Sequence, residues 1–473
     1  MRLICRLFYR QRKMENNHKK GLFQSGISIV SEGSILFILL AKGLIFFMNL
    51  MGRGSSLPGK LLLKIDKNIL TKLSRNYTVV LVTGTNGKTT TSFMIYNILK
   101  NAGLHVINNS AGANMTPGIV TCFVKNHHFI NRNTEKYAII EVDEAYLRQI
   151  ATQIDAKFIV ATNIFRDQLD RYGETTTTYK FILDGIKNRP NAKLILNGDE
   201  PMLGNMPVDN MCIYYGFSHY KEPEINANTE SIFCRDCKTP YEYKSSVFNH
   251  LGEYACSNCG HARPSLDYSI EMTKLYPDKS EFSISNEKYI VGVPGLYNIY
   301  NALCAFTVAS ELAVDKDVIK STLAVQESKF GRFETIAIDE SDLKLLLIKN
   351  PAGCNQCIDT AAIDQNKVAL MFMLNDKYAD GTDVSWIYDG QFEKLAAMNY
   401  SHVIIGGDRA YDMAIRLKVA GLDTGKFQIC HEYADLLEVI KKQKKTVYGF
   451  ATYTAMTSFR RYLVDKGFAE SVK

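Results

Sequence analysis

The chain has 473 residues, of which 46% are hydrophobic and 22% are charged, so two or three domains are expected rather than one core. The net charge of +7 suits an anionic ligand, an anionic membrane surface or nucleic acid, and selects none of them. The eleven cysteines are odd in number and include one tight cluster. This pattern excludes a disulfide framework and indicates a cytoplasmic protein with one metal site.

Residues 1–56 are predicted to form a basic and apolar N-terminal segment. Seven arginines and lysines precede an apolar run at 35–51. Lys42, Gly43 and Asn49 interrupt this run, which is marginal in length for a bilayer span and lacks a following small-residue cleavage pattern. A packed or membrane-surface amphipathic helix is therefore favoured over a true anchor, and a surface helix would place the protein at the inner face of the membrane.

Residues 57–335 are predicted to form a parallel α/β domain. Four continuous apolar runs are typical of strands that are buried on both faces, namely 77–84, 136–144, 157–163 and 192–200. Between the first two runs, Met94 and Ile98, like Ile95 and Leu99, are spaced four apart as on a helix, and Gly103 is a plausible stop. The alternation of strands and helices therefore indicates an α/β fold.

The alternation breaks at about 223–266, where the sequence is polar and rich in cysteine, and this segment is predicted to be an insertion. A second series of strands follows, at 343–350, 368–376, 402–409 and 445–451. This series predicts a separate C-terminal Rossmann-like α/β domain over residues 336–473.

A glycine-rich loop follows the first of these strands and precedes a helix. Residues 83–91 read TGTNGKTTT, and in this setting backbone N–H groups can bind phosphate oxygens. Lys88 is expected to reach the terminal phosphates and act in catalysis, and the Thr89 hydroxyl is expected to bind Mg²⁺. The generic signature also needs a glycine where this chain has Val82. The predicted nucleotide-binding residues of the loop are Gly84, Thr85, Asn86, Gly87, Lys88, Thr89 and Thr90.

Two C-x-x-C pairs lie in the insertion, eighteen residues apart, at Cys234 and Cys237 and at Cys256 and Cys259. Each pair can supply two thiolates to one tetrahedral Zn²⁺, so a zinc ribbon is predicted. A site closed by four cysteines has no open position, and its role should be folding rather than chemistry. A further pair at 354 and 357 stands alone, and packing is favoured over a redox role.

Without the earlier glycine, the loop resembles that of the Mur ligase and folylpolyglutamate synthase superfamily. Five further segments resemble its signatures in the same order: IIEVDEA at 139–145, TNIFRDQLDRYGE at 162–174, NGDEP at 197–201, GLYNIYNALCA at 295–305 and FGRFE at 330–334. The resemblance implies a Mur-ligase-type central domain that binds ATP and Mg²⁺, with Glu141 as a Mg²⁺ ligand, Asn298 near the adenine and Arg332 near the phosphates. Gln168 stands where many members have a metal-binding histidine, and the lysine that several members carbamylate has no match, which puts the second metal site of the superfamily in doubt.

Segments of the predicted C-terminal domain show which family within the superfamily the chain resembles. Members that add an amino acid commonly bind it through a D-x-x-H stretch, and here Leu346 and Lys349 stand at the corresponding positions. KNPAGCNQ at 349–356, the ribbon inside the central domain and NDKYADGTDVSWIYD at 375–389 together resemble the MurT family, the Mur-ligase-like subunits of lipid II isoglutaminyl synthase.

The MurT resemblance implies ATP-dependent amidation of the α-carboxylate of D-glutamate in lipid II, through an acyl phosphate that ammonia attacks. The chain shows no glutaminase elbow with a cysteine nucleophile, which agrees with a separate GatD-like glutaminase in a heterodimer. The resemblance also implies that Asp383 orients the catalytic histidine of this partner from across the interface. The rival carboxylates in the same segment are Asp376, Asp380 and Asp389.

Two alternatives remain open. The first is an amino-acid-adding ligase, either a Mur ligase or an enzyme similar to folylpolyglutamate synthase. The second is an ATPase that binds nucleic acid through its zinc ribbon, which would call for a basic and aromatic ribbon. Residues 238–255 mix both signs of charge, so a nucleic-acid partner is not expected.

Overall fold

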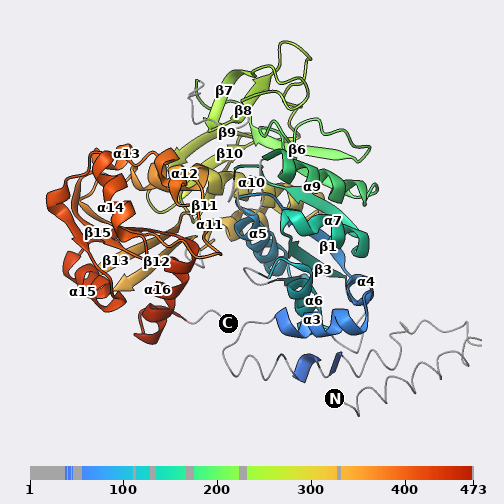
Figure 1. Cartoon of the computed structure of the whole chain (residues 1–473). Helices are drawn as coiled ribbons and strands as arrows, with labels where there is room; N and C mark the ends of the chain where they lie inside the picture. The colour runs from blue at the N-terminus through green and yellow to red at the C-terminus, as the bar shows by residue number, and fades with distance from the viewer. Residues whose placement is uncertain are drawn as a thin grey trace, which may run out of the picture.

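The computed structural model describes residues 38–39, 41–43, 45, 56–109, 113–127, 135–166, 175–222, 232–327 and 332–470. They form a large central sheet, a second sheet in the C-terminal part and a small two-stranded insertion (Figure 1). Most of the N-terminal segment 1–56 lies outside these residues. Within the described ranges, no helix is both long enough and apolar enough to cross a bilayer.

The central sheet has nine strands in the order β11-β10-β9-β6-β5-β4-β1-β3-β2. The strands from β2 across to β9 run parallel, and β9, β10 and β11 form an antiparallel edge. The bounds are β1 (Thr78–Thr83), β2 (His105–Asn108), β3 (Lys136–Glu141), β4 (Ala156–Ala161), β5 (Lys193–Asn197), β6 (Cys212–Phe217), β9 (Tyr268–Leu275), β10 (Ser280–Ile284) and β11 (Glu287–Val291).

Helices cover both faces of this sheet. They are α3 (Ser56–Ile65), α4 (Ile69–Ser74), α5 (Lys88–Asn101), α6 (Thr116–Lys125), α7 (Glu144–Gln153), α9 (Thr175–Lys187), α10 (Leu296–Glu311) and α11 (Lys316–Ala324). Val80 and Val82 of β1 pack in one core with α5 and α10, whereas Val79 and Leu81 pack in another core with α3, α6, α7 and α9. Because both faces of β1 are buried, its sequence is continuously apolar.

The C-terminal sheet has six strands in the order β12-β13-β17-β14-β15-β16. All neighbours are parallel except β12 and β13. The elements are β12 (Arg332–Ile338), β13 (Ser341–Leu347), α12 (Pro351–Ala361), β14 (Val368–Met373), η1 (Ser385–Asp389), α13 (Glu393–Ala396), β15 (Tyr400–Gly406), α14 (Ala410–Val419), η2 (Thr424–Lys426), β16 (Phe427–Ile429), α15 (Tyr433–Gln443), β17 (Thr446–Ala451) and α16 (Tyr453–Asp465). Helices α12 and α14 pack in the core on one face of this sheet, and α15 and α16 pack on the other.

The insertion is an antiparallel hairpin of β7 (Glu242–Phe248) and β8 (Leu251–Ala255), placed between β6 and β9 in chain order. Asn249 occupies its turn at φ 52°, a left-handed conformation that asparagine tolerates. The hairpin stands at one end of the central domain (Figure 1). The sequence-based fold class, a parallel α/β domain with a cysteine-rich insertion and a second α/β domain, is confirmed.

Candidate functional site

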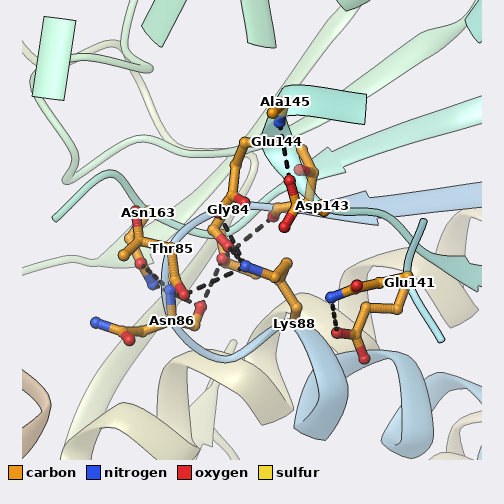
Figure 2. Close-up of polar contacts among 12 residues, drawn as sticks. Gly84, Thr85, Asn86, Lys88, Glu141, Asp143, Glu144, Ala145 and Asn163 are labelled. Carbon is orange, nitrogen blue, oxygen red and sulfur yellow. Dashed lines mark hydrogen bonds and ion pairs between the residues drawn. The ribbon is translucent and has the colours of Figure 1, made fainter. Parts of the chain in front are cut away.

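The glycine-rich loop lies where the sequence predicts it, between the end of β1 and the start of α5 (Figure 2). Gly84 and Gly87 have φ values of 119° and 85°, which favour glycine. A Cβ atom at Gly84 would lie 2.3 Å from the Thr162 hydroxyl oxygen, and one at Gly87 would lie 2.2 Å from Oδ1 of Asn301. No side chain caps the first turn of α5 at Gly87, so its N–H groups can serve an anion.

The segment that follows β4 fixes the loop conformation. The Asn86 N–H donates to Oδ1 of Asn163 at 2.9 Å, and the Asn163 amide donates back to the Asn86 carbonyl at 3.1 Å. The Thr85 N–H donates to the Asn163 carbonyl at 2.9 Å, and the Phe165 N–H donates to the Thr85 hydroxyl at 3.1 Å. The loop is therefore held in one shape by the side chain of Asn163 and the backbone around it, which is the preorganisation that a phosphate site needs.

Lys88 lies in the loop and contacts a buried carboxylate. Its Nζ atom is 2.9 Å from Oε1 of Glu144 and 2.6 Å from the Gly84 carbonyl oxygen (Figure 2). The exposed fractions of the Lys88 and Glu144 side chains are 13% and 6%. Burial is the largest single influence on the pKa of Lys88 and lowers it, but Glu144, Glu141 and Asp143 together outweigh burial, so the net pKa lies above that of an ordinary lysine and the ammonium stays charged. Burial raises the pKa of the Glu144 carboxyl in turn, while Lys88 opposes that shift.

Thr89 and Glu141 lie together at the start of α5 and the end of β3. The Thr89 hydroxyl donates to Oε2 of Glu141 at 2.6 Å, and the Asn114 amide donates to Oε1 of Glu141 at 3.1 Å. Asn109 fixes the backbone of Glu141 through two hydrogen bonds of 2.8 and 2.9 Å. Neighbouring oxygen ligands of octahedral Mg²⁺ lie about 2.9 Å apart. The Thr89 and Glu141 oxygens therefore fit two such positions.

Asn298 and Asn301 lie in the first turns of α10, beside the loop. Asn298 is buried, donates to the Pro294 carbonyl at 2.7 Å and accepts from the Asn301 amide at 3.2 Å. Oδ1 of Asn301 accepts from the Thr91 hydroxyl at 3.2 Å, so Asn301 is the member of this pair that contacts the residues around the loop. The second asparagine of GLYNIYNA could have indicated this residue.

The structure gives less detail for Thr90 and Arg332, the two remaining predicted nucleotide-binding residues. Thr90 is half-buried in the first turn of α5. Arg332 is the first residue of β12, and its side chain is not among those that the structure describes. Gln168 lies outside the described residues.

The C-terminal domain contacts the loop directly. The Asn350 amide donates to Oδ1 of Asn86 at 3.3 Å, while Oδ1 of Asn350 caps α12 by accepting from Gly353. Farther along, Arg166 of the central domain pairs with Asp389. Between the domains lies a cavity of about 430 Å³, whose walls include Phe248, Leu296, Ala352, Asn355, Gln356 and Lys394. The cavity adjoins the first turns of α10 and α12, which also carry the contacts to the loop.

The four insertion cysteines converge as predicted. Their Sγ atoms all lie within 4.8 Å of one another. The Sγ atoms of Cys234 and Cys259 are 3.5 Å apart, and those of Cys237 and Cys256 are 3.4 Å apart. In a Zn²⁺ site of four thiolates the sulfur atoms lie about 3.8 Å apart, so the cluster fits this ion. Hydrogen bonds from Thr239 lower the pKa of Cys237 to about 5. At Cys259 the His261 backbone lowers the pKa, but the neighbouring thiols outweigh it and raise the pKa to about 12.

Two matching turns of backbone present these thiols. The Lys238 N–H donates to the Cys234 carbonyl at 2.9 Å, and the Gly260 N–H donates to the Cys256 carbonyl at 3.1 Å. Lys238 and Gly260 have φ values of 66° and 74°. The two C-x-x-C segments therefore have equivalent local structures, as expected for a ribbon that holds one metal between two knuckles.

The lone cysteine pair in α12 does not resemble a reactive site. Cys354 and Cys357 are buried in the core of the C-terminal domain. Burial raises the pKa of Cys357 to about 12 and that of Cys354 well above the ordinary value. Such thiols are inert, so their place in the core supports the packing interpretation.

Asp383 differs in its hydrogen-bond partners from the three other candidate carboxylates of its segment. Asp380 accepts from the Thr454 N–H at 2.7 Å, Asp376 pairs with Arg409 at 2.9 Å, and Asp389 pairs with Arg166. Asp383 is exposed, and its Oδ1 atom accepts from the N–H of Ser385, two residues along the chain, at 2.8 Å. This backbone hydrogen bond lowers the pKa of Asp383, so its carboxylate is ionised and faces solvent.

Comparisons with known proteins cover both domains. The family model of the Mur ligase middle domain matches residues 82–309, and that of the MurT ligase C-terminal domain matches residues 347–456. The chain is 40% identical to the lipid II isoglutaminyl synthase (glutamine-hydrolyzing) subunit MurT of Streptococcus pneumoniae (strain ATCC BAA-255 / R6), over 91% of this chain and 97% of that protein. It is 35% identical to the protein of the same name from Staphylococcus aureus (strain COL), over 78% and 84%.

Solved structures share the fold. A pseudomurein peptide ligase type C from Methanothermus fervidus matches with a TM-score of 0.59 and 23% identity, over 82% of this chain and 79% of that one. MurF from Acinetobacter baumannii matches with a TM-score of 0.60 and 15% identity, over 87% and 81%. At these identities the likeness concerns the fold alone.

Proposed function

Because the chain belongs to the MurT family of Mur-ligase-like proteins, we propose that it amidates the α-carboxylate of D-glutamate in lipid II in an ATP-dependent reaction, giving D-isoglutamine. One observation carries the proposal. A preformed phosphate loop with a largely buried, charged Lys88 lies in a chain that aligns over nearly the whole length of a lipid II isoglutaminyl synthase subunit.

The reaction needs ATP because a carboxylate is a poor electrophile. A carboxylate oxygen attacks the γ-phosphorus, ADP leaves, and the product is an acyl phosphate. The nitrogen of ammonia then attacks the carbonyl carbon, inorganic phosphate leaves with the former carboxylate oxygen, and ammonia loses a proton. Lys88 and the loop N–H groups would stabilise the transferring phosphate electrostatically. Thr89 and Glu141 would hold Mg²⁺, which supplies further charge neutralisation when bound.

The arrangement of the two domains offers a place for the rest of the nucleotide. The cavity between them adjoins α10, where Asn298 and Asn301 lie, and α12, whose cap Asn350 contacts the loop. The rest of the nucleotide would lie on this side of the loop, near the start of α10. In this proposal Asn298 lies near the adenine and Arg332 near the phosphates.

Ammonia would come from a GatD-like glutaminase that forms a heterodimer with this chain. A surface on the C-terminal domain supports this partner. Tyr411, Ile415 and Val419 are spaced four apart on α14 and have exposed fractions of 62%, 55% and 67%. Exposed apolar stripes of this kind are typical of protein interfaces.

Asp383 closely precedes an element that contacts α14. η1, which begins two residues after it, packs on α14, because the Arg416 guanidinium donates to the Ile387 carbonyl at 3.0 Å. A cysteine and histidine pair in a glutaminase needs a third group that accepts the imidazole N–H. Asp383 would supply this carboxylate across the interface.

A location in the cytoplasm, peripheral to the inner face of the membrane, would suit an amphipathic lipid substrate. Helix α3 supports this location. Leu57, Leu61 and Ile65 are spaced four apart on it and have exposed fractions of 46%, 43% and 41%, and Lys60 and Lys64 are exposed on the same helix. Apolar and basic side chains together suit an anionic bilayer surface.

Comparing nitrogen sources tests the proposal. The purified chain is incubated with ATP, Mg²⁺ and lipid II, and with either an ammonium salt or single amino acids. Ammonium should drive ADP release and convert one carboxyl of lipid II to an amide. ADP release that requires an amino acid, with a product heavier by an amino-acid residue, would instead indicate an amino-acid-adding ligase.

A further inference from the structure

The tip of the zinc-ribbon hairpin is buried in the central domain. His250, in the turn between β7 and β8, is fully buried, and its Nε2 atom lies 2.8 Å from Oε2 of Glu200. Glu200 is also fully buried and follows β5. A buried carboxylate and imidazole in contact are costly unless each is well hydrogen-bonded, so this contact is a specific feature of the fold.

Glu200 connects the hairpin tip to the segment that holds the phosphate loop. Its Oε2 atom also accepts from the Ile164 N–H at 3.0 Å, and its Oε1 atom accepts from the Met202 N–H at 3.1 Å. Ile164 directly follows Asn163, the residue that exchanges two hydrogen bonds with Asn86 of the loop. The Glu200 carboxylate therefore contacts both the hairpin tip and the segment 163–165, which is hydrogen-bonded to the phosphate loop.

A second contact runs through Phe165. Its ring centroid lies 4.8 Å from that of His250 and 6.1 Å from that of Phe248, which is also in the hairpin. The Phe165 N–H donates to the Thr85 hydroxyl, and the Thr85 N–H donates to the Asn163 carbonyl. The path from ribbon to phosphate loop is thus continuous in both hydrogen bonds and ring packing.

The ribbon depends on its metal for its own shape. Its two strands are a marginal structure alone, and its small core consists of Cys234, Tyr241, Tyr254 and Cys256, with Cys237 and Tyr243 packed against it. Two of these buried residues are proposed metal ligands. Binding of Zn²⁺ by the four thiols would therefore order the hairpin.

We propose that His250 is a positioning residue, through which the metal-ordered ribbon holds the phosphate loop in its nucleotide-binding shape. The proposal rests on the proposed function, because it takes the loop to bind ATP. It gives the ribbon a role in nucleotide affinity in addition to folding. The Zn²⁺ and nucleotide sites are then linked through the Glu200 and Phe165 contacts of the hairpin tip.

The test compares His250→Ala with a matched variant in the same ribbon. His261→Ala removes another buried histidine. Its ring contacts the Tyr241 hydroxyl at 2.7 Å, the Gly204 carbonyl at 3.1 Å and the Tyr254 ring, whereas the His250 ring contacts the Glu200 carboxylate and the Phe165 ring. Both full-length variants are assayed for zinc content, thermal stability, affinity for a non-hydrolysable ATP analogue with Mg²⁺, and hydrogen exchange at residues 84–87.

His250→Ala should retain zinc, weaken binding of the analogue roughly ten-fold and speed exchange in the loop. His261→Ala should lower stability while affinity and loop exchange stay close to those of the unaltered protein. If His250→Ala does not fold, Phe165→Leu tests the same connection. This change removes the ring contacts with His250 and Phe248 but keeps the backbone hydrogen bond to Thr85. It should speed hydrogen exchange in the loop and weaken binding of the ATP analogue in the same way.

Two results separate the proposals. A folded His250→Ala protein with unchanged affinity and unchanged loop exchange overturns the positioning role alone, as would equal losses of affinity in both histidine variants. An unaltered protein that binds no ATP analogue would instead overturn the proposed function.

Discussion

The Nζ atom of Lys88 lies 2.9 Å from Oε1 of Glu144, which is buried, and the Lys88 side chain itself is 13% exposed. The same ammonium contacts the carbonyl oxygen of Gly84 within the loop. A positive charge is thus fixed at the place where the loop would bind the terminal phosphates, and a carboxylate keeps it charged.

Lys88→Ala should abolish ATP-dependent turnover, with a loss of at least about 100-fold, because it removes the loop's positive charge from the β and γ phosphates. ADP release in the presence of lipid II and ammonium measures this effect. Lys100→Ala is a matched control, since Lys100 is exposed at the other end of α5 and should tolerate the change. Near-normal activity of Lys88→Ala would refute the role of the lysine.

The cysteine cluster should hold about one Zn²⁺ per chain. Replacing Cys234 and Cys237 together by serine should eliminate the metal and lower the melting temperature, with folding damaged before chemistry. The pair Cys354→Ser and Cys357→Ser is the control, because these thiols lie in the C-terminal core and should leave the zinc content unchanged. Metal analysis that finds no zinc in the purified, reduced protein would contradict the prediction.

Asp383→Asn should leave formation of the complex and ammonium-driven amidation largely intact, while glutamine-driven amidation collapses. The amide cannot stabilise an imidazolium as a carboxylate does. Asp423→Asn is the matched control, since Asp423 is an exposed aspartate of the same domain that accepts from the N–H two residues along, as Asp383 does. Failure of ammonium to rescue Asp383→Asn, or unchanged glutamine hydrolysis by the complex, would exclude the trans-acting role.

Removal of the residues before Gly52 should lower activity on lipid II in vesicles. Replacing Leu57, Leu61 and Ile65 by glutamine should likewise weaken sedimentation with vesicles that contain anionic lipid. Met272→Gln, which alters a residue that is 74% exposed, controls for loss of apolar surface in general. Equal binding and equal activity of all these proteins would leave the N-terminal segment and α3 without a membrane role.

The sequence predicted those helices and strands whose apolar residues follow a regular local spacing. The continuous apolar run at 77–84 corresponds to β1, and the helical spacing after it corresponds to α5. The antiparallel edge of β9, β10 and β11 was not anticipated, because these strands are only partly buried and carry charged residues such as Glu271, Lys274 and Lys288 at exposed positions. Family resemblance, drawn from ordered motifs, is confirmed by the comparisons.

The predicted site residues were those that motifs mark, and the missed ones act across long sequence separations. Glu144 is 56 residues from Lys88, Asn163 is 77 from Asn86, and Asn350 is 264 from Asn86. No local pattern reports such contacts, since they depend on the order of strands in the sheet. Glu144 could have been suspected, because it follows Glu141 in IIEVDEA, whereas His250 gave no signal in the hairpin sequence.

Amidation by this chain should proceed through phosphorylation of a carboxylate. The most direct test uses lipid II whose D-glutamate α-carboxylate carries heavy oxygen, incubated with the chain, ATP, Mg²⁺ and ammonium. We expect one heavy oxygen to appear in the released inorganic phosphate for each amide formed at the α-carboxylate, with one ADP produced. Unlabelled phosphate alongside amide formation, or no ammonium-dependent amide at all, would contradict the account.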